Sequence, residues 1–372
     1  MIKDVKGVLL ACIVVTLMAT GSAKAVLWGD TVESKIDVID GVVVSNDSML
    51  DVMDSKLDII DQELSVLDAT VNSGTTFLTS ADIVGGNIDL ASAGNYTLAA
   101  ALTTDVTITA GCVTLDLNDL CLTGTILISS DNATIKNGTL LPLDEAGAGI
   151  SVTSASDRTR VSNLTIRCDS GVGQAGPGKD GIEIAGNDWI VENCTIIAGD
   201  SGGAFRGGHG ISLLAAANNI LIRNCLISTG DGGDSATAGD GGNGVNVNGS
   251  TDVEIADCTI FKTGAGGDGA SAEGDGGNGM FIASTSTDIS VHNCIIRNTG
   301  AAGTGSATGV AGKAIDDDVA AGAAGSVVFG NFAHNIANAT KYDLQASGIE
   351  SGFSLSNPPS STAVSVYANV FI

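Results

Sequence analysis

The sequence predicts an all-β solenoid of parallel strands, with three short strands in each coil, preceded by an α-helical coiled-coil segment. The first observation is a phrase that returns at intervals of 30 to 36 residues, as VSNLTIR, VENCTII, IRNCLIS, IADCTIF and VHNCIIR. A second phrase runs in step with it, as AGISV, DGIEI, HGISL, NGVNV and NGMFI. Self-similarity at such a period is the signature of a solenoid. The third observation is a heptad pattern over residues 31–71, which is typical of a coiled coil.

The N-terminal 25 residues carry the pattern of a secretory signal peptide. Lys3 and Lys6 precede the apolar run GVLLACIVVTLMA, and the following SAKA contains an A-x-A cleavage pattern at Ala23 and Ala25. The apolar run is too short to span a bilayer comfortably. We therefore expect cleavage after Ala25 and export of the mature chain, either as a secreted protein or to the cell surface.

Residues 26–73 are expected to form a stalk. Apolar residues occupy eleven of the twelve seam positions between Val32 and Val71, and the spacing of 3 and 4 residues is kept throughout. Polar Asn46 falls at a core position, where one polar layer commonly fixes register and oligomer number. The β-branched residues Ile36 and Ile39 in the first half of the seam favour three strands. The stalk therefore predicts a homotrimer held through residues 31–71.

Residues 74–340 are expected to form the coils. A short corner between two strands needs a left-handed backbone, which Asn and Asp tolerate better than most residues, and stacked Asn side chains can also bond along the ladder. The residue after each corner becomes the first inward position of the next strand, a column in which we also place Phe332. We expect corners at Asn163, Asn193, Asn224, Asp257 and Asn293, followed by buried, reduced thiols at Cys194, Cys225, Cys258 and Cys294.

These repeated phrases, with residues 95–140, resemble the right-handed parallel β-helix superfamily, which has the pectate-lyase-like fold, and in particular secreted bacterial β-helix proteins. The resemblance implies a right-handed β-helix up to about residue 340. Residues 341–372 lose the repeat and are expected to form a C-terminal cap. Because this fold serves lyases, hydrolases, tailspikes and adhesins alike, the resemblance leaves the function open.

Charge and composition narrow the range of partners. The chain holds 42 Asp and Glu against 16 Lys and Arg, a formal net charge of -26. This balance argues against nucleic acid, which attracts basic surfaces. Aromatic residues make up only 3% of the chain, which weakens the case for a groove that stacks sugars on aromatic rings.

One motif points to catalysis. The stretch GGHGIS around His209 resembles the Gly-His-Gly motif of polygalacturonase-type glycoside hydrolases, and Asp180 and Asp200 then resemble two of that family's acids. Hydrolysis of a glycosidic bond needs two carboxylates flanking the bond, but Ser201 stands where the family has its second neighbouring Asp. The alternative is that His209 belongs to a polar ladder of turns, since it fills the slot that Asp180 fills one coil earlier.

Long Gly-rich loops follow the third strand of each later coil. Two of them share GDGGNG in register, so Asp240 and Asp275 are expected to stack about one strand spacing apart. Like charges that close are unfavourable unless a cation or water screens them, and Gly-rich loops beside carboxylates suit Ca²⁺. The alternative is a set of flexible or loosely stacked loops without a metal.

The sequence as a whole predicts an exported surface or extracellular β-helix protein with a binding or structural role, similar to an adhesin or a tailspike. Its long-loop face is the expected contact surface, and a glycan or another cell-surface molecule is the expected ligand. The alternative is a polysaccharide-active enzyme, a glycoside hydrolase or lyase, acting through Asp180, Asp200 and His209.

Overall fold

A computed structural model of the chain describes residues 74–142, 148–152, 156–168, 176–305 and 309–318, together with 327–329, 331–334, 336–338, 342–344, 349–351 and 354–355. The predicted signal peptide and stalk lie outside the described residues. Within the described part, no helix has the length and apolarity needed to cross a membrane.

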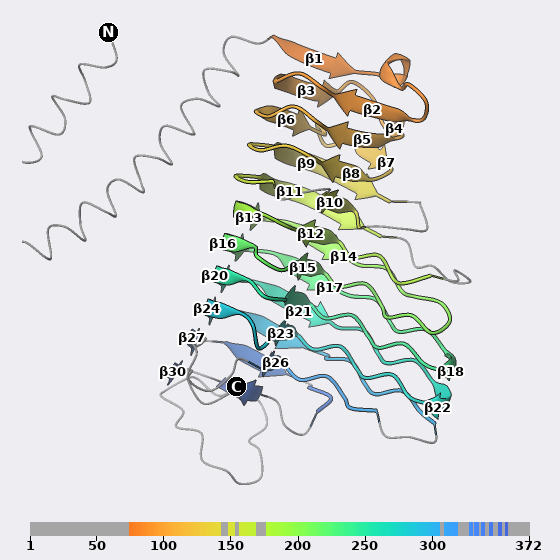
Figure 1. Cartoon of the computed structure of the whole chain (residues 1–372), viewed down its shortest axis with the longest axis vertical. Coiled ribbons are helices and arrows are strands. Elements are labelled where there is room, and N and C mark those ends of the chain that lie inside the picture. Colours follow the sequence, from red (N-terminus) through yellow and green to blue (C-terminus); the bar gives the residue numbers. More distant parts are fainter. Residues whose placement is uncertain are drawn as a thin grey trace, which may run out of the picture. The chain divides into compact units, whose positions relative to one another are not determined.

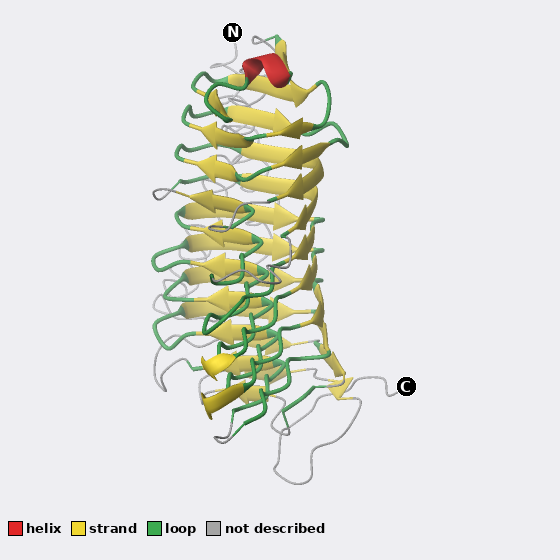
Figure 2. Ribbon diagram, turned by 90° about the vertical axis from the view of Figure 1, so that its right-hand side faces the viewer, coloured by secondary structure: helices red, strands yellow, loops and turns green. Residues whose placement is uncertain are grey.

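The described residues form a parallel β-helix, as predicted (Figures 1 and 2). One wall of the solenoid, wall A, is a 10-stranded sheet. Its strands are β2 (Asn87–Leu90), β5 (Asp105–Ile108), β8 (Ile126–Ile128), β10 (Ile150–Val152), β12 (Ile182–Ile184), β15 (Ile211–Leu213), β19 (Val245–Val247), β23 (Met280–Ile282), β26 (Ile315–Asp317) and β29 (Tyr342–Leu344).

A 19-stranded sheet bends at the Asn corners and supplies the two other walls. Wall B precedes the corner and holds β1 (Thr75–Leu78), β3 (Gly94–Leu98), β6 (Val113–Asp116), β13 (Asn187–Glu192), β16 (Asn218–Arg223), β20 (Thr251–Ala256), β24 (Thr287–His292), β27 (Val327–Phe329) and β30 (Ile349–Ser351). Wall C follows the corner and holds β4 (Leu102–Thr103), β7 (Cys121–Thr123), β14 (Thr195–Ile197), β17 (Leu226–Ser228), β21 (Thr259–Lys262), β25 (Ile295–Arg297), β28 (Phe332–His334) and β31 (Ser354–Leu355). Two strands run through the corner and belong to both walls, β9 (Thr134–Leu141) and β11 (Arg160–Arg167).

Each coil runs from wall A to wall B, turns the Asn corner into wall C, and returns through a loop to the next strand of wall A. Strands of successive coils pair in parallel, as between β12 and β15, β13 and β16, and β14 and β17. Outside the walls lie a short 3-10 helix, η1 (Ser80–Asp82), and two paired strands in the long loops, β18 (Ser235–Thr237) and β22 (Gly269–Ala272). After residue 340, β29, β30 and β31 pair with β26, β27 and β28, so the solenoid continues into the segment predicted as a cap.

The core consists of aliphatic columns, because each short strand alternates apolar and polar residues and the register between coils is kept. Burial of this surface is the main stabilising contribution to the fold. Trp189 is the largest side chain that is fully buried, and its Nε1 donates to the Ser156 carbonyl at 2.6 Å. One column of wall A, entirely buried, contains Ile126, Ile150, Ile182, Ile211, Val245, Met280 and Ile315.

The corner between walls B and C is left-handed in every described coil from β9 to β25. Its residues have φ between 52° and 55°, and they are Asn137, Asn163, Asn193, Asn224, Asp257 and Asn293. One bond between corner side chains joins Asn163 Nδ2 to Asn137 Oδ1 at 3.3 Å. A second left-handed ladder, which we did not predict, opens wall B with φ between 54° and 59° at Asp188, Asn219, Asp252 and Asp288.

The four cysteines after the corners are buried free thiols in one column. The contact with Cys225, together with burial, raises the pKa of the Cys194 thiol above its usual range. The prediction for Phe332 is wrong. Asn331 lies buried instead and its Oδ1 accepts the Cys294 N–H at 2.7 Å, while Phe332 pairs with the outward residue Ile295.

Candidate binding surface

Asp180 precedes β12 at the edge of wall A and forms a buried ion pair. Its two carboxylate oxygens accept bonds from the Arg206 guanidinium at 2.9 and 3.1 Å, and one of them also accepts the His209 backbone N–H at 2.7 Å. The Asp180 side chain is only 3% exposed. These three donors satisfy both oxygens of the buried carboxylate, so Asp180 holds two coils together and has no oxygen without a partner.

His209 occupies the same slot one coil later and is also buried. Its Nδ1 accepts the Asn243 backbone N–H at 2.8 Å. Burial lowers the pKa of His209 to about 4, with Asp180 opposing this shift and Arg206 adding to it. The ladder continues, because Asn243 Oδ1 accepts the Asn278 N–H at 2.8 Å. The turn-ladder interpretation therefore describes how His209 is used in this structure.

Asp200 lies on the loop after β14, and its Oδ1 accepts the Asp231 backbone N–H of the next coil at 2.8 Å. The structure thus brings Asp180 and His209 into direct contact and gives Asp200 a separate bond between coils. Each of the three residues predicted for hydrolysis is engaged in coil-to-coil hydrogen bonding.

Glu183, which we did not single out, is a further carboxylate in this region, and its pKa is shifted. It points outward from β12, next to Asp180. Burial raises the pKa of the Glu183 carboxyl, Asp180 raises it further, and Arg206 opposes both effects. The signal was present in the sequence as the outward position of DGIEI.

The long loops form an ordered extension, the flange, comprising residues 198–210, 229–244, 263–279, 298–305 and 309–314. Each loop leaves wall C along an outgoing limb and returns to wall A along a returning limb, and Figure 1 shows these limbs running side by side beyond the walls. Backbone bonds alternate between the two kinds of limb. They run from Gly208 N–H to Gly199 O (2.9 Å), Gly230 to Gly208 (3.1 Å), Gly242 to Gly230 (2.9 Å), Gly264 to Gly242 (3.2 Å), Gly277 to Gly264 (2.8 Å), Gly300 to Gly277 (3.2 Å) and Gly312 to Gly300 (2.8 Å).

A second row of the same kind lies three residues further along each limb. It includes the bond from Gly239 N–H to Gly233 O at 3.0 Å and the bond from Gly267 N–H to Gly239 O at 2.9 Å. A repeat of three residues is that of an extended polyproline-type helix. Glycine is required where neighbouring limbs approach closely, since a Cβ on Gly242 would lie 1.9 Å from the Gly208 carbonyl oxygen. The expectation of loosely stacked loops is therefore wrong.

Aspartates line the flange in ladders. Asp240 Oδ1 accepts the Asp275 backbone N–H at 2.9 Å, and Asp275 Oδ1 accepts the Val310 N–H at 2.7 Å. Asp234 and Asp268 are joined in the same way at 2.8 Å. The carboxylates predicted to stack are thus in successive coils, and a backbone donor offsets part of their repulsion. No group of three or more His, Cys, Asp or Glu within the described ranges is placed to hold a metal ion.

The geometry of the coils agrees with a comparison of the sequence with known families. Residues 148–350 match the model described as the right handed beta helix region. The chain belongs to the right-handed β-helix family. No curated protein matches its sequence.

Three solved structures similar to this right-handed β-helix chain have 12% sequence identity to it. PfbA, a surface adhesin of Streptococcus pneumoniae, gives a TM-score of 0.31 and covers 73% of this chain and 70% of its own. Endo-xylogalacturonan hydrolase from Aspergillus tubingensis gives 0.29, covering 77% and 94%. The A-module of mannuronan C-5 epimerase AlgE6 from Azotobacter vinelandii gives 0.23, covering 77% and 92%.

Proposed function

We propose that this chain is an exported surface or extracellular protein with a binding or structural role, and that the flange is its contact surface. Export rests on the signal-peptide pattern of residues 1–25. The observation that carries the binding role is the flange, in which the limbs of successive coils are hydrogen-bonded to one another. These bonds preorganise the surface, and preorganisation lowers the entropic cost of binding.

The use of the predicted catalytic residues also supports a binding role. Asp180, Asp200 and His209 bond to neighbouring coils through the groups that hydrolysis would need free. An inverting glycosidase needs one acid to protonate the leaving oxygen and one base to activate water. Asp180 serves neither purpose while Arg206 holds both of its oxygens.

Binding of the mature chain to intact cells and to immobilised glycans tests this proposal. Wild-type protein is expected to bind, and Asp240→Ala with Asp275→Ala is expected to weaken binding because both carboxylates line the flange. Calcium is expected to strengthen binding and a chelator to reverse that effect. Asp89→Ala in wall A, which removes a carboxylate outside the flange, is the matched control. No binding in any of these assays would contradict the proposal.

The alternative, a polysaccharide-active enzyme, has one observation in its favour. Glu183 is a partly exposed carboxyl with a raised pKa on the outward face of wall A, and an acid with such a pKa is suited to protonating a leaving oxygen. The test is release of reducing ends from polygalacturonate and related polymers. Cleavage by the wild type that disappears in Glu183→Gln, with the fold intact by circular dichroism, would establish the enzyme in place of the binding protein.

A further inference from the structure

The strands of wall C contain no Asp or Glu among the described residues, in a chain that has 42 of them. Read from β7 to β28, the strand segments of this wall are CLT, TLL, TIR, TII, LIS, TIFK, IIR and FAH. The other two walls carry acids, such as Glu192 and Glu254 in wall B and Glu183 and Asp316 in wall A. Wall C is thus a face without carboxylates on a strongly acidic protein.

Two outward columns run along wall C, set by the register of the strands. The first contains threonines and three large apolar residues, Leu226, Ile295 and Phe332, which are 39%, 37% and 36% exposed. The second contains most of the cations of this face. The first column is Thr139, Thr165, Thr195, Leu226, Thr259, Ile295 and Phe332, and the second includes Arg167, Ile197, Ser228, Lys262, Arg297 and His334.

The pairing of the cations distinguishes this face from the rest of the molecule. Arg167 and Arg297, both exposed, are the only Lys or Arg side chains in the described part that have neither an ion pair nor a hydrogen bond there. Lys179 donates to the Pro142 carbonyl. All the others pair with an acid, namely Lys136, Arg158, Arg160, Arg206, Arg223, Lys262 and Lys313. Among the described residues, neither of these two guanidinium groups has a carboxylate partner, so we take both as available to an external anion.

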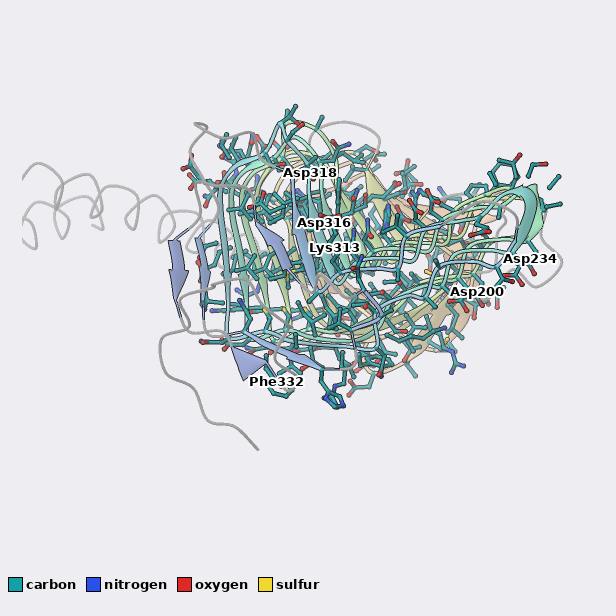
Figure 3. The ribbon with its side chains drawn as sticks, turned by 90° about the horizontal axis from the view of Figure 1, so that it is seen from below. Asp200, Asp234, Lys313, Asp316, Asp318 and Phe332 are labelled. Carbon is teal, nitrogen blue, oxygen red and sulfur yellow. The ribbon has the colours of Figure 1, made fainter. Side chains whose placement is uncertain are left out.

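An aromatic surface lies beside these cations. The rings of Phe332 and His334 are nearly parallel, with centroids 6.4 Å apart and an interplanar angle of 11°. Arg297 pairs in register with His334, one coil away. Figure 3 shows Phe332 on one side of the solenoid, with Asp316 of wall A and Lys313 of the flange on the other side, and Asp200 and Asp234 elsewhere on the flange. This face is therefore separate from wall A and from the aspartate ladders.

We propose that wall C binds a linear anionic polysaccharide, carboxylated or sulfated, laid along the axis of the solenoid. The guanidinium groups of Arg167 and Arg297 bind its acidic groups, since the planar fork of arginine matches carboxylate and sulfate oxygens. With four coil steps between them and about 4.8 Å per step, these two groups are about 19 Å apart, a span for several sugar units. Phe332 offers a ring face to the apolar side of a sugar, and the threonines offer hydroxyl groups.

The charge pattern of wall C favours an anionic polysaccharide over a second copy of this chain and over a nucleic acid duplex. A second copy packed on the same face would bury like charges against each other without acids to neutralise them, which is costly. A nucleic acid duplex is wider than one three-residue strand and would meet the acids at the flange edge, where Asp231 already pairs with Lys262 at 3.2 Å. A single extended polymer is narrower than a duplex and can follow the two outward columns of wall C.

The proposal concerns a second face and rests on the proposed function only in taking the chain to be an extracellular binding protein. The test is binding of the mature protein to immobilised polygalacturonate, dextran sulfate and neutral dextran, in the presence of a chelator. The chelator removes any calcium bridge to the flange, so that wall C is measured alone. Wild-type protein is expected to bind both anionic polymers and not dextran, with affinity falling as salt is raised.

The double variant Arg167→Gln with Arg297→Gln is expected to lose affinity by at least about tenfold, and Phe332→Ser is expected to weaken binding as well. Arg158→Gln is the control to compare with each single variant, Arg167→Gln and Arg297→Gln, because it removes one charge from an exposed arginine that pairs with Asp131 outside wall C. Three results would overturn the inference: no binding to either anionic polymer, equal losses in Arg158→Gln, or a change of oligomeric state in the double variant without loss of polymer binding. Retained calcium-dependent binding through Asp240 and Asp275 in those cases would leave the proposed function standing.

Discussion

The corner residues show how one backbone angle constrains the sequence. Asn193 has φ of 54°, and its backbone N–H donates to the Arg223 carbonyl of the next coil at 3.2 Å. A residue with a Cβ and no short polar side chain is strained in this region by about 1–2 kcal/mol. Asn193→Ala is therefore expected to lower the free energy of unfolding by about that amount, measured by urea denaturation. Asn193→Gly, which adopts positive φ without strain, is the control and is expected to stay near the wild type.

His209 makes the stability of the solenoid depend on pH in the mildly acidic range. Its pKa is about 4 in the folded chain and about 6.5 in an unfolded chain, so the unfolded chain takes up the proton first. Stability is therefore fully present above pH 6.5 and is lost as pH falls toward 4. The loss from this one group between about pH 7.5 and about pH 5 is about 2 kcal/mol.

Urea denaturation at the two pH values, with His209→Asn as the comparison, measures this effect. Asn already fills the same slot at Asn243 and Asn278, so the variant keeps the ladder and removes the titrating group. The difference in stability between the two pH values is expected to be smaller in the variant by about 2 kcal/mol. An equal pH dependence in both proteins would show that His209 is not responsible.

The residue scale also shows what the sequence could and could not predict. The left-handed corners followed from the recurrence of Asn and from its tolerance of positive φ, and the alignment of His209 with Asp180 already suggested a ladder. The ion pair of Asp180 with Arg206 could not be predicted from the sequence. The two residues lie in successive coils, and the conformation of the loop that carries Arg206 brings them together. Phe332 was misplaced by one residue, because Asn331 takes the next place in the column and bonds there to the Cys294 N–H and the Val291 carbonyl.

The long-loop face was predicted, but the hydrogen-bonded order of the flange was missed because its period is short. Between β11 and β27 the walls repeat at intervals of 30 residues or more. Each flange limb instead repeats every three residues, as from Gly230 to Gly233 and from Gly239 to Gly242. Gly-rich segments in isolation predict flexible chain, since glycine loses the most conformational entropy on folding. Here the backbone groups of neighbouring limbs satisfy one another, and only the stacking of coils brings those limbs together.

The close approach of the limbs makes a single methyl group costly in the flange. A Cβ on Gly242 would lie 1.9 Å from the Gly208 carbonyl oxygen, which is backbone and cannot swing aside. Gly242→Ala is expected to destabilise the chain by about 1–3 kcal/mol, the usual cost of overpacking. Gly74→Ala is the control, because a Cβ there has no neighbour within 4 Å. Hydrogen exchange of the flange amides, together with urea denaturation, measures both effects.

Equal stability of the Gly242→Ala and Gly74→Ala variants would contradict the packing of the limbs. The loop after β25 already has alanine in a flange limb, at Ala302, where the preceding coil has Gly266. The prediction therefore applies to positions such as Gly242, where the neighbouring backbone leaves no room for a methyl group, and it separates a packed flange from a flexible one.

At the scale of the whole chain, acids are distributed unevenly over the described walls. Wall B and wall A carry them at outward positions, the flange holds them in ladders, and wall C has none. Composition alone does not show this distribution, because a net charge of -26 predicts a uniformly acidic surface. The strand register and the coil geometry are both needed to sort outward residues by wall. The net charge of the chain argues against nucleic acid as a ligand. An anionic polymer on wall C is compatible with that argument, because this narrow face has no acids among its described strand residues.

The oligomeric state is a prediction that depends on residues 31–71, which lie outside the described part. The seam keeps its 3-4 spacing for more than five heptads, with Asn46 as its one polar core position, and a seam of this kind associates because its apolar residues are buried only between chains. The mature chain is expected to be a trimer by light scattering. A chain beginning at residue 74 is expected to be a monomer with an unchanged β-sheet signal by circular dichroism.

Asn46→Ile provides the second measurement for the trimer. Removing a polar layer from a coiled-coil core raises stability and relaxes the choice of oligomer number, so the variant is expected to melt at higher temperature and to form mixed oligomers. Asp47→Asn, next to Asn46 and off the seam, is the control and is expected to leave both properties unchanged. A mature chain that is a monomer at micromolar concentration would contradict the predicted trimeric stalk. The contacts described for the walls and the flange do not depend on that result, because a monomeric β-helix from residue 74 onward satisfies all of them.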